Sequence, residues 1–261
     1  MITTNPIFKD LLSSVQFLSR LPIPVALADE SEPDFTRSSR LFPIAGLIIT
    51  IPALVAMIVL GIFGVPAMVI AAIVIAIQVI VTGALHEDGL ADCADGFGGG
   101  QTPEEKLEIM KDSRIGAFGV AALIMALLLR FALLSALIST SLMAGLLAYG
   151  AAQIVSRAVQ VYFWQNLPSA KPEGLSSAYG EPDEGSVRWA LGTGVIAALA
   201  LTLFTFNVTS IFIAFILVLI AFLAFHMLCQ KQINGQTGDT LGAIQILAEI
   251  AFLIGLTTFI A

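Results

Sequence analysis

Seven apolar stretches, each near the length that crosses a lipid bilayer, constrain this chain more than any other feature. A membrane-spanning helix needs roughly 20 mainly apolar residues at about 1.5 Å each. Of the 261 residues, 57% are hydrophobic and only 12% are charged, about half the charged share of a soluble globular protein. We therefore predict an all-α, polytopic transmembrane helix bundle with about seven spans. The predicted spans are about 42–60, 66–85, 116–137, 139–163, 190–206, 208–229 and 241–260.

The predicted organisation is one integral membrane domain over residues 1–261. Residues 1–40 form an N-terminal cytoplasmic or interfacial segment, and 41–261 form the bundle with its active-site loops. Apolar residues recur at helical spacing near the start, which predicts an amphipathic helix; they are Phe8, Leu11, Leu12, Val15 and Leu18. Such a helix either lies on the membrane surface or packs on the bundle as an ordinary short helix.

The basic residues indicate how the chain is oriented. Of its twelve Lys and Arg residues, Arg130 and Arg157 fall inside predicted spans, and the other ten lie on one side if seven spans alternate. Because basic loops stay in the cytoplasm, we predict a multi-pass protein of the cytoplasmic (inner) membrane whose active-site loops face the cytoplasm. One richly charged face favours an enzyme over a transporter, which would place polar groups near the bilayer midplane. The net charge of -7 argues against a nucleic-acid partner.

The stretch HEDGLADCADGFGGG, residues 86–100, contains three aspartates at i, i+4 and i+7. On a helix, Asp88, Asp92 and Asp95 share one face, where their charges repel unless a cation neutralises them. Hard oxygen ligands favour Mg²⁺ or Mn²⁺, ions that hold substrate phosphates. These three residues are therefore candidate metal ligands; the alternative is a solvated acidic face at the mouth of a span.

Two further loops carry candidate residues. Thr102-Pro103-Glu104-Glu105 has the pattern of a capping box and begins a helix that leads to Lys111-Asp112-Ser113-Arg114, where a basic residue can reach a phosphate. The loop before the last span contains Gln236-Thr237-Gly238-Asp239. Free N–H groups at a helix start suit anion binding, and Asp239 is a candidate fourth metal ligand. The alternative for this loop is an ordinary helix N-cap.

Together these stretches resemble the cobalamin synthase (adenosylcobinamide-GDP ribazoletransferase) family. HEDGLADCADG, KDSRIGAFG and NGQTGDTLGA are similar to its three signature loops. Further matches in family order are FLSRLPIP, Arg37 with Phe42-Pro43, Val155-Ser156-Arg157 and Glu173-Gly174-Leu175. Glu87 departs from the pattern, which has an apolar residue there.

The resemblance implies a Mg²⁺-dependent membrane enzyme that completes the assembly of vitamin B12. Its substrates would be adenosylcobinamide-GDP and α-ribazole or α-ribazole 5′-phosphate, and GMP would leave. Asp88 and Asp92 would bind metal, and Asp95 would bind metal or act as the base. The candidates for substrate binding are Arg37, Lys111, Asp112, Ser113, Arg114, Arg157, Gln236, Thr237 and Gly238. A CDP-alcohol phosphotransferase-like enzyme and a cation transporter are the alternatives, and a homo-oligomer is left open.

Glu249 lies near the centre of the last predicted span, where an isolated charge costs roughly 2.5–3.5 kcal/mol on insertion scales. We expect a partner, with Arg130 or Arg157 as the candidates. The alternative is a protonated Glu249 hydrogen-bonded to Ser, Thr or backbone groups.

The charge distribution generates a prediction about topology. Reporter fusions at Gly64, Ser139 and Thr209 should report the outside of the membrane, because no basic residue lies in those turns. Fusions at Gly100, Glu181 and Gly235 should report the cytoplasm. One signature loop found outside would contradict a shared active site.

Overall fold

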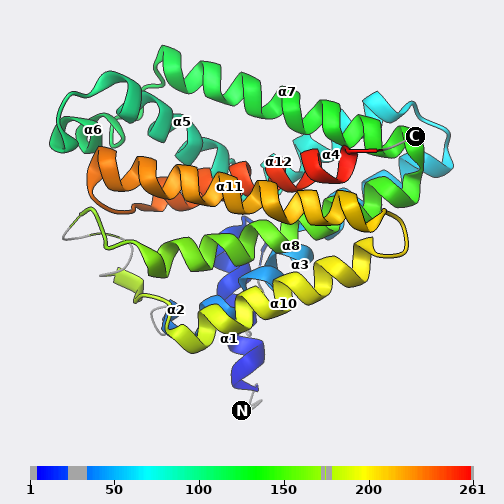
Figure 1. Ribbon diagram of the computed structural model, residues 1–261, viewed down its shortest axis with the longest axis horizontal. Helices are drawn as coiled ribbons and strands as arrows, with labels where there is room; N and C mark the ends of the chain where they lie inside the picture. The colour runs from blue at the N-terminus through cyan, green and yellow to red at the C-terminus, as the bar shows by residue number, and fades with distance from the viewer. Residues whose placement is uncertain (1–4, 23–33, 172–173, 175–177, 260–261) are drawn as a thin grey trace.

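The computed structural model (Figure 1) describes residues 5–22, 34–171, 174 and 178–259. Over these residues the chain is helical, with one isolated β-bridge between Ser169 and Gln236, which confirms the all-α prediction. The elements are α1 Pro6–Leu18, α2 Phe35–Ser38, η1 Ser39–Leu41, α3 Phe42–Ile62, α4 Ala67–Thr82, α5 Leu85–Gly99, α6 Pro103–Ile109, α7 Ala117–Thr140, α8 Leu142–Asn166, α10 Glu184–Thr202, α11 Val208–Ile233 and α12 Gly238–Thr257.

Six of these helices are each long and apolar enough to cross a membrane: α3, α7, α8, α10, α11 and α12. Their positions confirm six of the seven predicted spans. Helices α8 and α12 are the most enclosed. Helix α8 contacts α3, α7 and α10, while α12 contacts α5, α7 and α11. The bundle is therefore built around two central helices, and the other spans expose an apolar outer face.

The second predicted span, about 66–85, corresponds to α4, but this helix ends before the aspartate stretch and does not continue straight into it. Helix α4 ends at Thr82, and α5 starts at Leu85 with its axis bent by 87° from that of α4. The break uses two successive left-handed residues, Gly83 with φ 65° and Ala84 with φ 59°. Glycine adopts this conformation readily, whereas alanine does so at a cost. The aspartates therefore lie on a separate helix that need not follow the direction of α4.

The N-terminal helix α1 packs on α3 through the buried Val15 and Leu18. Its Phe17 ring lies 4.5 Å from Phe35, centroid to centroid. Figure 1 shows α1 running across the direction of the spans. These contacts confirm the packed alternative, while the exposed Ile7 and Phe8 at its start are what a membrane-surface helix would present.

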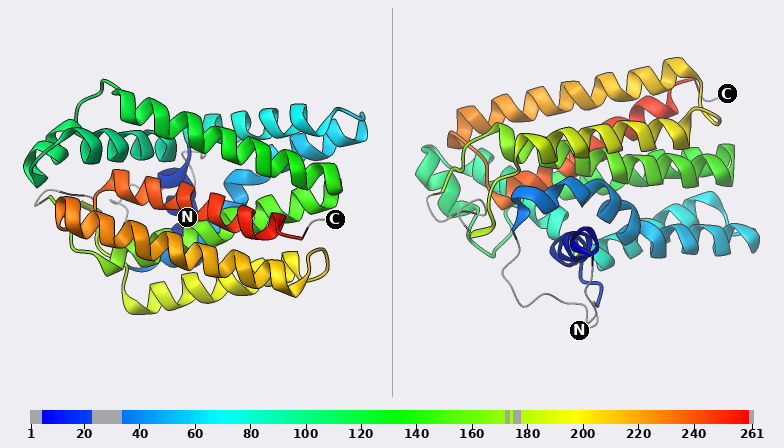
Figure 2. Two further views of the ribbon diagram at one scale, coloured as in Figure 1. Left: turned by 45° about the horizontal axis from the view of Figure 1, so that its top comes forward. Right: turned by 90° about the horizontal axis from the view of Figure 1, so that it is seen from below.

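The two ends of the bundle differ. Figure 2 shows α6 and the end of α5 at one end, and the α3–α4 turn with the C-terminus at the other. The loops before α7, α10 and α12 lie at the α6 end (Figure 1). The two signature loops before α7 and α12 therefore lie at the same end of the bundle as the end of α5, the helix that carries the aspartate signature.

The charge in the last span has the predicted kind of partner. Arg130 of α7 donates from Nε to Glu249 of α12 at 2.8 Å, and from Nη1 to Glu87 of α5 at 2.7 Å. The Arg130 and Glu249 side chains are 3% and 0% exposed, so both charges are fully enclosed. The structure thereby confirms the pairing of Glu249 with Arg130, and it explains Glu87, the one departure from the family pattern. A single guanidinium joins three helices.

Arg157 belongs to the interior of the bundle as well. It is 1% exposed and donates from Nη1 to the Gln153 side chain at 2.9 Å. Gln245 connects this group to the ion pairs, because its amide donates to Ser156 at 3.0 Å and to Glu249 at 3.2 Å. The polar groups of α8 and α12 thus form one buried network.

Removing the shared cation should destabilise the bundle strongly. Breaking a buried ion pair costs roughly 3–5 kcal/mol because the partner charge stays buried and unpaired, so Arg130→Met should unfold at a much lower temperature in detergent. The matched control is Arg188→Met, whose ion pair with Glu184 is exposed and worth about 0–1 kcal/mol. Equal melting temperatures for the two variants would contradict a structural role for Arg130.

Candidate functional site

Helix α5 carries the three aspartates on one face but at different depths. Asp88 is exposed, Asp92 is half-buried and Asp95 is buried. The predicted helical spacing is confirmed, since all three lie within Leu85–Gly99. Their surroundings differ, so their roles must be considered separately.

Asp95 caps the start of α7. Its two carboxylate oxygens accept from the backbone N–H of Gly116 at 2.6 Å and of Gly119 at 2.8 Å. Helix α7 has no side-chain cap of its own at Gly116, and a carboxylate at a helix start satisfies otherwise free N–H groups and favours the helix dipole. Both glycines are required here, because a Cβ at either would collide with the Asp95 carboxylate. The loop KDSRIGAFG is therefore fixed to α5 through Asp95.

Gly89 allows α5 to contact the start of α12. A Cβ at Gly89 would lie 2.5 Å from the backbone carbonyl oxygen of Asp239. Further along the same contact, a Cβ at Gly242 would lie 3.1 Å from the Cα of His86. The close approach places Asp239 beside the aspartate face, where burial and the charges of Asp88, Asp239 and Asp95 raise the pKa of Asp92 to about 7. The structure thus brings the predicted fourth acid to the other three.

A residue that sequence reasoning did not assign also reaches the cluster. The backbone of Gln236 exchanges two hydrogen bonds with the loop after α8, one with Pro168 and one with Ala170, both at 2.8 Å. This pairing places the Lys171 Nζ 4.0 Å from the Asp239 Oδ2. Lys171 gives no sequence signal beyond being a cation in a loop between two predicted spans, because its position depends on pairing between two distant loops.

The loop before α12 caps the N-terminus of that helix, with Thr237 as the N-cap residue. Thr237 accepts from the Thr240 backbone N–H at 3.3 Å, and Thr240 Oγ1 accepts in return from Thr237 N–H at 2.9 Å. The Thr237 hydroxyl also donates to Asp239 at 3.1 Å. The N-cap alternative is therefore confirmed, and anion binding by Gln236, Thr237 and Gly238 stays a prediction. Gly238 is exposed at the first helical position, while Gln236 is buried.

The basic loop after α6 is exposed. The capping box that begins α6 is confirmed, with Thr102 and Glu105 bonded reciprocally. Arg114 donates to Asp112 from Nε at 3.0 Å, and this hydrogen bond lowers the Asp112 pKa to about 2. Lys111, Ser113 and Arg114 are exposed. Because Arg114 is close in sequence to Gly116, which bonds Asp95, its guanidinium lies on the loop that borders the cluster.

The two remaining candidate arginines lie elsewhere. Arg37 pairs with Asp10 of α1 at 3.2 Å and its side chain is 56% exposed. The guanidinium of Arg157 is enclosed in the network around Gln153. No described contact joins either one to the aspartates. Ile23, Pro24, Glu173 and Leu175, which belong to the other family matches, lie outside the described residues.

The carboxylates are clustered but are not assembled around a common point. Within the residues the structure describes, no three His, Cys, Asp or Glu side chains are placed to share a metal ion. The predicted convergence of Asp88, Asp92 and Asp95 is therefore not present, and the reason is that Asp95 is bonded to α7. Mg²⁺ commonly uses only one or two carboxylates together with waters and substrate phosphates. Asp88, Asp92 and Asp239 have the oxygen chemistry for that mode.

Fold and site together define a polytopic, all-helical membrane protein with a clustered-aspartate site at one end of its bundle. Residues 10–257 match the family described as cobalamin-5-phosphate synthase. Curated relatives named adenosylcobinamide-GDP ribazoletransferase cover nearly the whole chain. The protein from Sinorhizobium medicae is 40% identical over 255 residues, 97% of each chain.

A relative of the same name from Rhizobium etli is 41% identical over 251 residues, 95% of this chain and 96% of its own. One from Brucella ovis is 40% identical over 254 residues, 97% of each. No solved structure matches. The chain belongs to the cobalamin-5-phosphate synthase family.

The contact at Gly89 can be tested directly. Gly89→Ala should lower both the melting temperature and the activity, because its Cβ would meet backbone rather than a movable side chain and would push α5 away from Asp239. Gly192→Ala is the matched control: it lies inside α10, has nothing within 4 Å of its Cβ position and should gain up to about 1 kcal/mol in helix propensity. If Gly89→Ala and Gly192→Ala changed the melting temperature and the activity equally, the close packing of α5 on α12 would not be needed for stability or for activity.

Proposed function

We propose that this protein is an adenosylcobinamide-GDP ribazoletransferase. A ribose hydroxyl of α-ribazole, or of its 5′-phosphate, attacks the cobinamide-side phosphorus of adenosylcobinamide-GDP. A new P–O bond forms, the P–O bond to GMP breaks, and GMP leaves. The observation that carries the proposal is that relatives of this name match the chain almost end to end, while the other two signature stretches, before α7 and before α12, contact the aspartate helix.

The donor set favours Mg²⁺ as the cofactor. One or two of Asp88, Asp92 and Asp239 would hold it together with waters and substrate phosphates, because these three are the carboxylates at the accessible part of the cluster. When bound, Mg²⁺ would neutralise charge on the diphosphate. Asp95 is not included among the proposed ligands, since both of its oxygens accept N–H bonds from α7.

The chain's own residues have distinct tasks in this proposal. Phosphoryl transfer depends mainly on positioning and charge neutralisation. Lys171, held at Asp239, and Arg114, on the exposed loop beside Asp95, are the cations that would bind the diphosphate. Asp95 holds that loop to α5 and so determines the position of the Arg114 backbone. Asp95 is the candidate base for the proton of the attacking hydroxyl, since each of its oxygens accepts one N–H bond and keeps a second lone pair.

We place the site at the cytoplasmic face of the inner membrane. The support is the distribution of basic residues. All ten Lys and Arg residues outside the predicted spans lie on the side of the signature loops if seven spans alternate, and basic loops stay in the cytoplasm. The polar substrates and the leaving GMP then exchange with the cytoplasm without crossing the bilayer.

Asp88→Asn tests the metal-dependent chemistry. The substitution keeps the shape of the side chain but removes a charge that would act on Mg²⁺ in the transition state, so turnover should fall by roughly 10³-fold or more. Binding of adenosylcobinamide-GDP should fall much less, and Asp239→Asn should show a smaller loss. The measurement is GMP release from adenosylcobinamide-GDP and α-ribazole by purified protein across a Mg²⁺ titration.

The control for this series is Glu104→Gln, an exposed acid in the first turn of α6, which should retain the wild-type rate. Near-native rates for both Asp88→Asn and Asp92→Asn at saturating Mg²⁺ would exclude the metal mechanism. Failure of the wild-type protein to release GMP would exclude the proposed reaction itself.

A further inference from the structure

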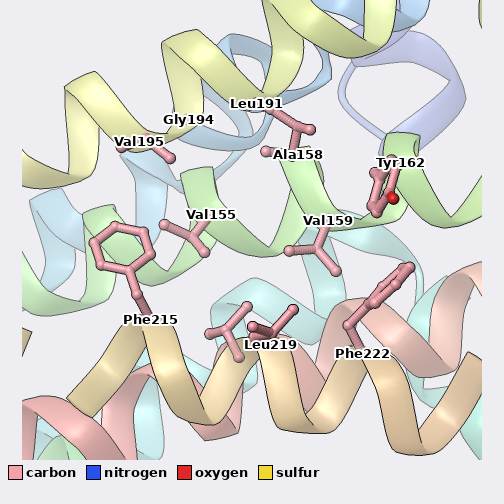
Figure 3. Close-up of a pocket in the computed structure, with 11 residues that line it drawn as sticks. Val155, Ala158, Val159, Tyr162, Leu191, Gly194, Val195, Phe215, Leu219 and Phe222 are labelled. Atoms are coloured by element: carbon pink, nitrogen blue, oxygen red, sulfur yellow. The ribbon is translucent and has the colours of Figure 1, made fainter. Parts of the chain in front are cut away.

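An apolar groove lies between α8, α10 and α11, away from the aspartate site (Figure 3). Its volume is about 210 Å³. None of the side chains that line it is charged, and Tyr162 carries the one polar group among them. The lining residues are Val155, Ala158, Val159, Tyr162, Leu191, Gly194, Val195, Phe215, Val218, Leu219 and Phe222.

The groove exists because α10 and α11 are attached to different central helices. Gly194 brings α10 against α8, where a Cβ would lie 2.6 Å from the Ala158 Cβ. Gly255 of α12 brings α11 against α12, where a Cβ would collide with the backbone of Ala214. Although a short turn joins α10 to α11, α10 packs along α8 and α11 packs along α12. The surface of α8 between them is therefore left uncovered.

The groove has a buried floor and exposed rims. Val155 and Val159 of α8 are 4% and 9% exposed, and Figure 3 shows them pointing toward α11. Val195 of α10 and Leu219 of α11 form the rims and are 42% and 51% exposed. These rim residues lie near the middle of their helices, so in a membrane-spanning bundle the groove opens into the hydrocarbon layer.

Aromatic rings close both ends. Tyr162 stacks on Phe222 with ring centroids 4.9 Å apart, and at the other end Phe215 packs edge-on against Phe252 at 5.5 Å. Phe215 and Phe222 are seven residues apart on α11, about 10 Å along the helix axis. The groove is therefore a slot of limited length, which is closed at its two ends and open along the side between its rims.

We propose that this slot binds an acyl chain of a membrane phospholipid. Water is excluded as its main occupant, because a buried water needs two to four polar partners. A flexible hydrocarbon chain is the component of the surroundings that fits, and filling the slot supplies the dispersion contacts that a void would lose.

The test places a fluorophore on the rim. Leu219→Cys, labelled with bimane, is reconstituted into vesicles with increasing amounts of phosphatidylcholine brominated on the acyl chain, which quenches fluorescence on contact. Native Cys93 and Cys229 are buried, so the label reports position 219. The matched control is Leu128→Cys in the middle of α7, a position 55% exposed and outside the slot.

A bound chain should quench the label at position 219 at a brominated fraction roughly tenfold lower than the label at position 128. Adding Val159→Phe, which fills the slot from its floor, should abolish that difference while the protein keeps its helical circular dichroism. Equal quenching at the two positions would overturn the proposal. Relief of quenching at position 219 by α-ribazole would also overturn it, because the slot would then belong to a substrate. The assay does not use turnover, so it is independent of the proposed reaction.

Discussion

The guanidinium of Arg130 is the group on which the arrangement of the site depends. In hydrocarbon a charge needs a partner within the protein, and Arg130 has two, Glu87 and Glu249, on different helices. Glu87 directly precedes Asp88 in the sequence. The same ion pairs that satisfy buried charges therefore hold the first turn of the aspartate helix against α7 and α12.

Small residues complete what the buried charges start. Gly89 lets α5 contact the start of α12, and Gly116 and Gly119 let the Asp95 carboxylate reach the N–H groups of α7. In each case glycine leaves space for a polar group or a backbone to come within hydrogen-bonding range. Away from the site, Gly194 and Gly255 draw α10 and α11 to different helices, and the apolar slot is the result. One packing device thus produces both the polar site and the apolar slot.

The aspartate spacing predicted the shared face, but it did not predict the separate roles on that face. Asp88 and Asp92 are accessible, whereas Asp95 is bonded to α7. Helical periodicity reports which side chains lie together on one helix. It carries no information about which neighbouring helix supplies hydrogen-bond donors. The place of Lys171 depends in the same way on pairing between the loops around Pro168 and Gln236, so no local pattern could indicate it.

By itself the sequence determined the class of protein, six of the spans and the cap of α6, and it named the N-cap of α12 and a charged partner for Glu249 as one of two alternatives in each case. These properties follow from hydropathy and from residues a few positions apart, which act locally along the chain. Only the tertiary structure decided that the chain bends at Gly83 and Ala84, that Arg130 joins three helices, and that Asp95 caps α7. The physical reason is that a glycine or a charge permits a close approach without specifying its partner. The partner is selected when all the helices pack together.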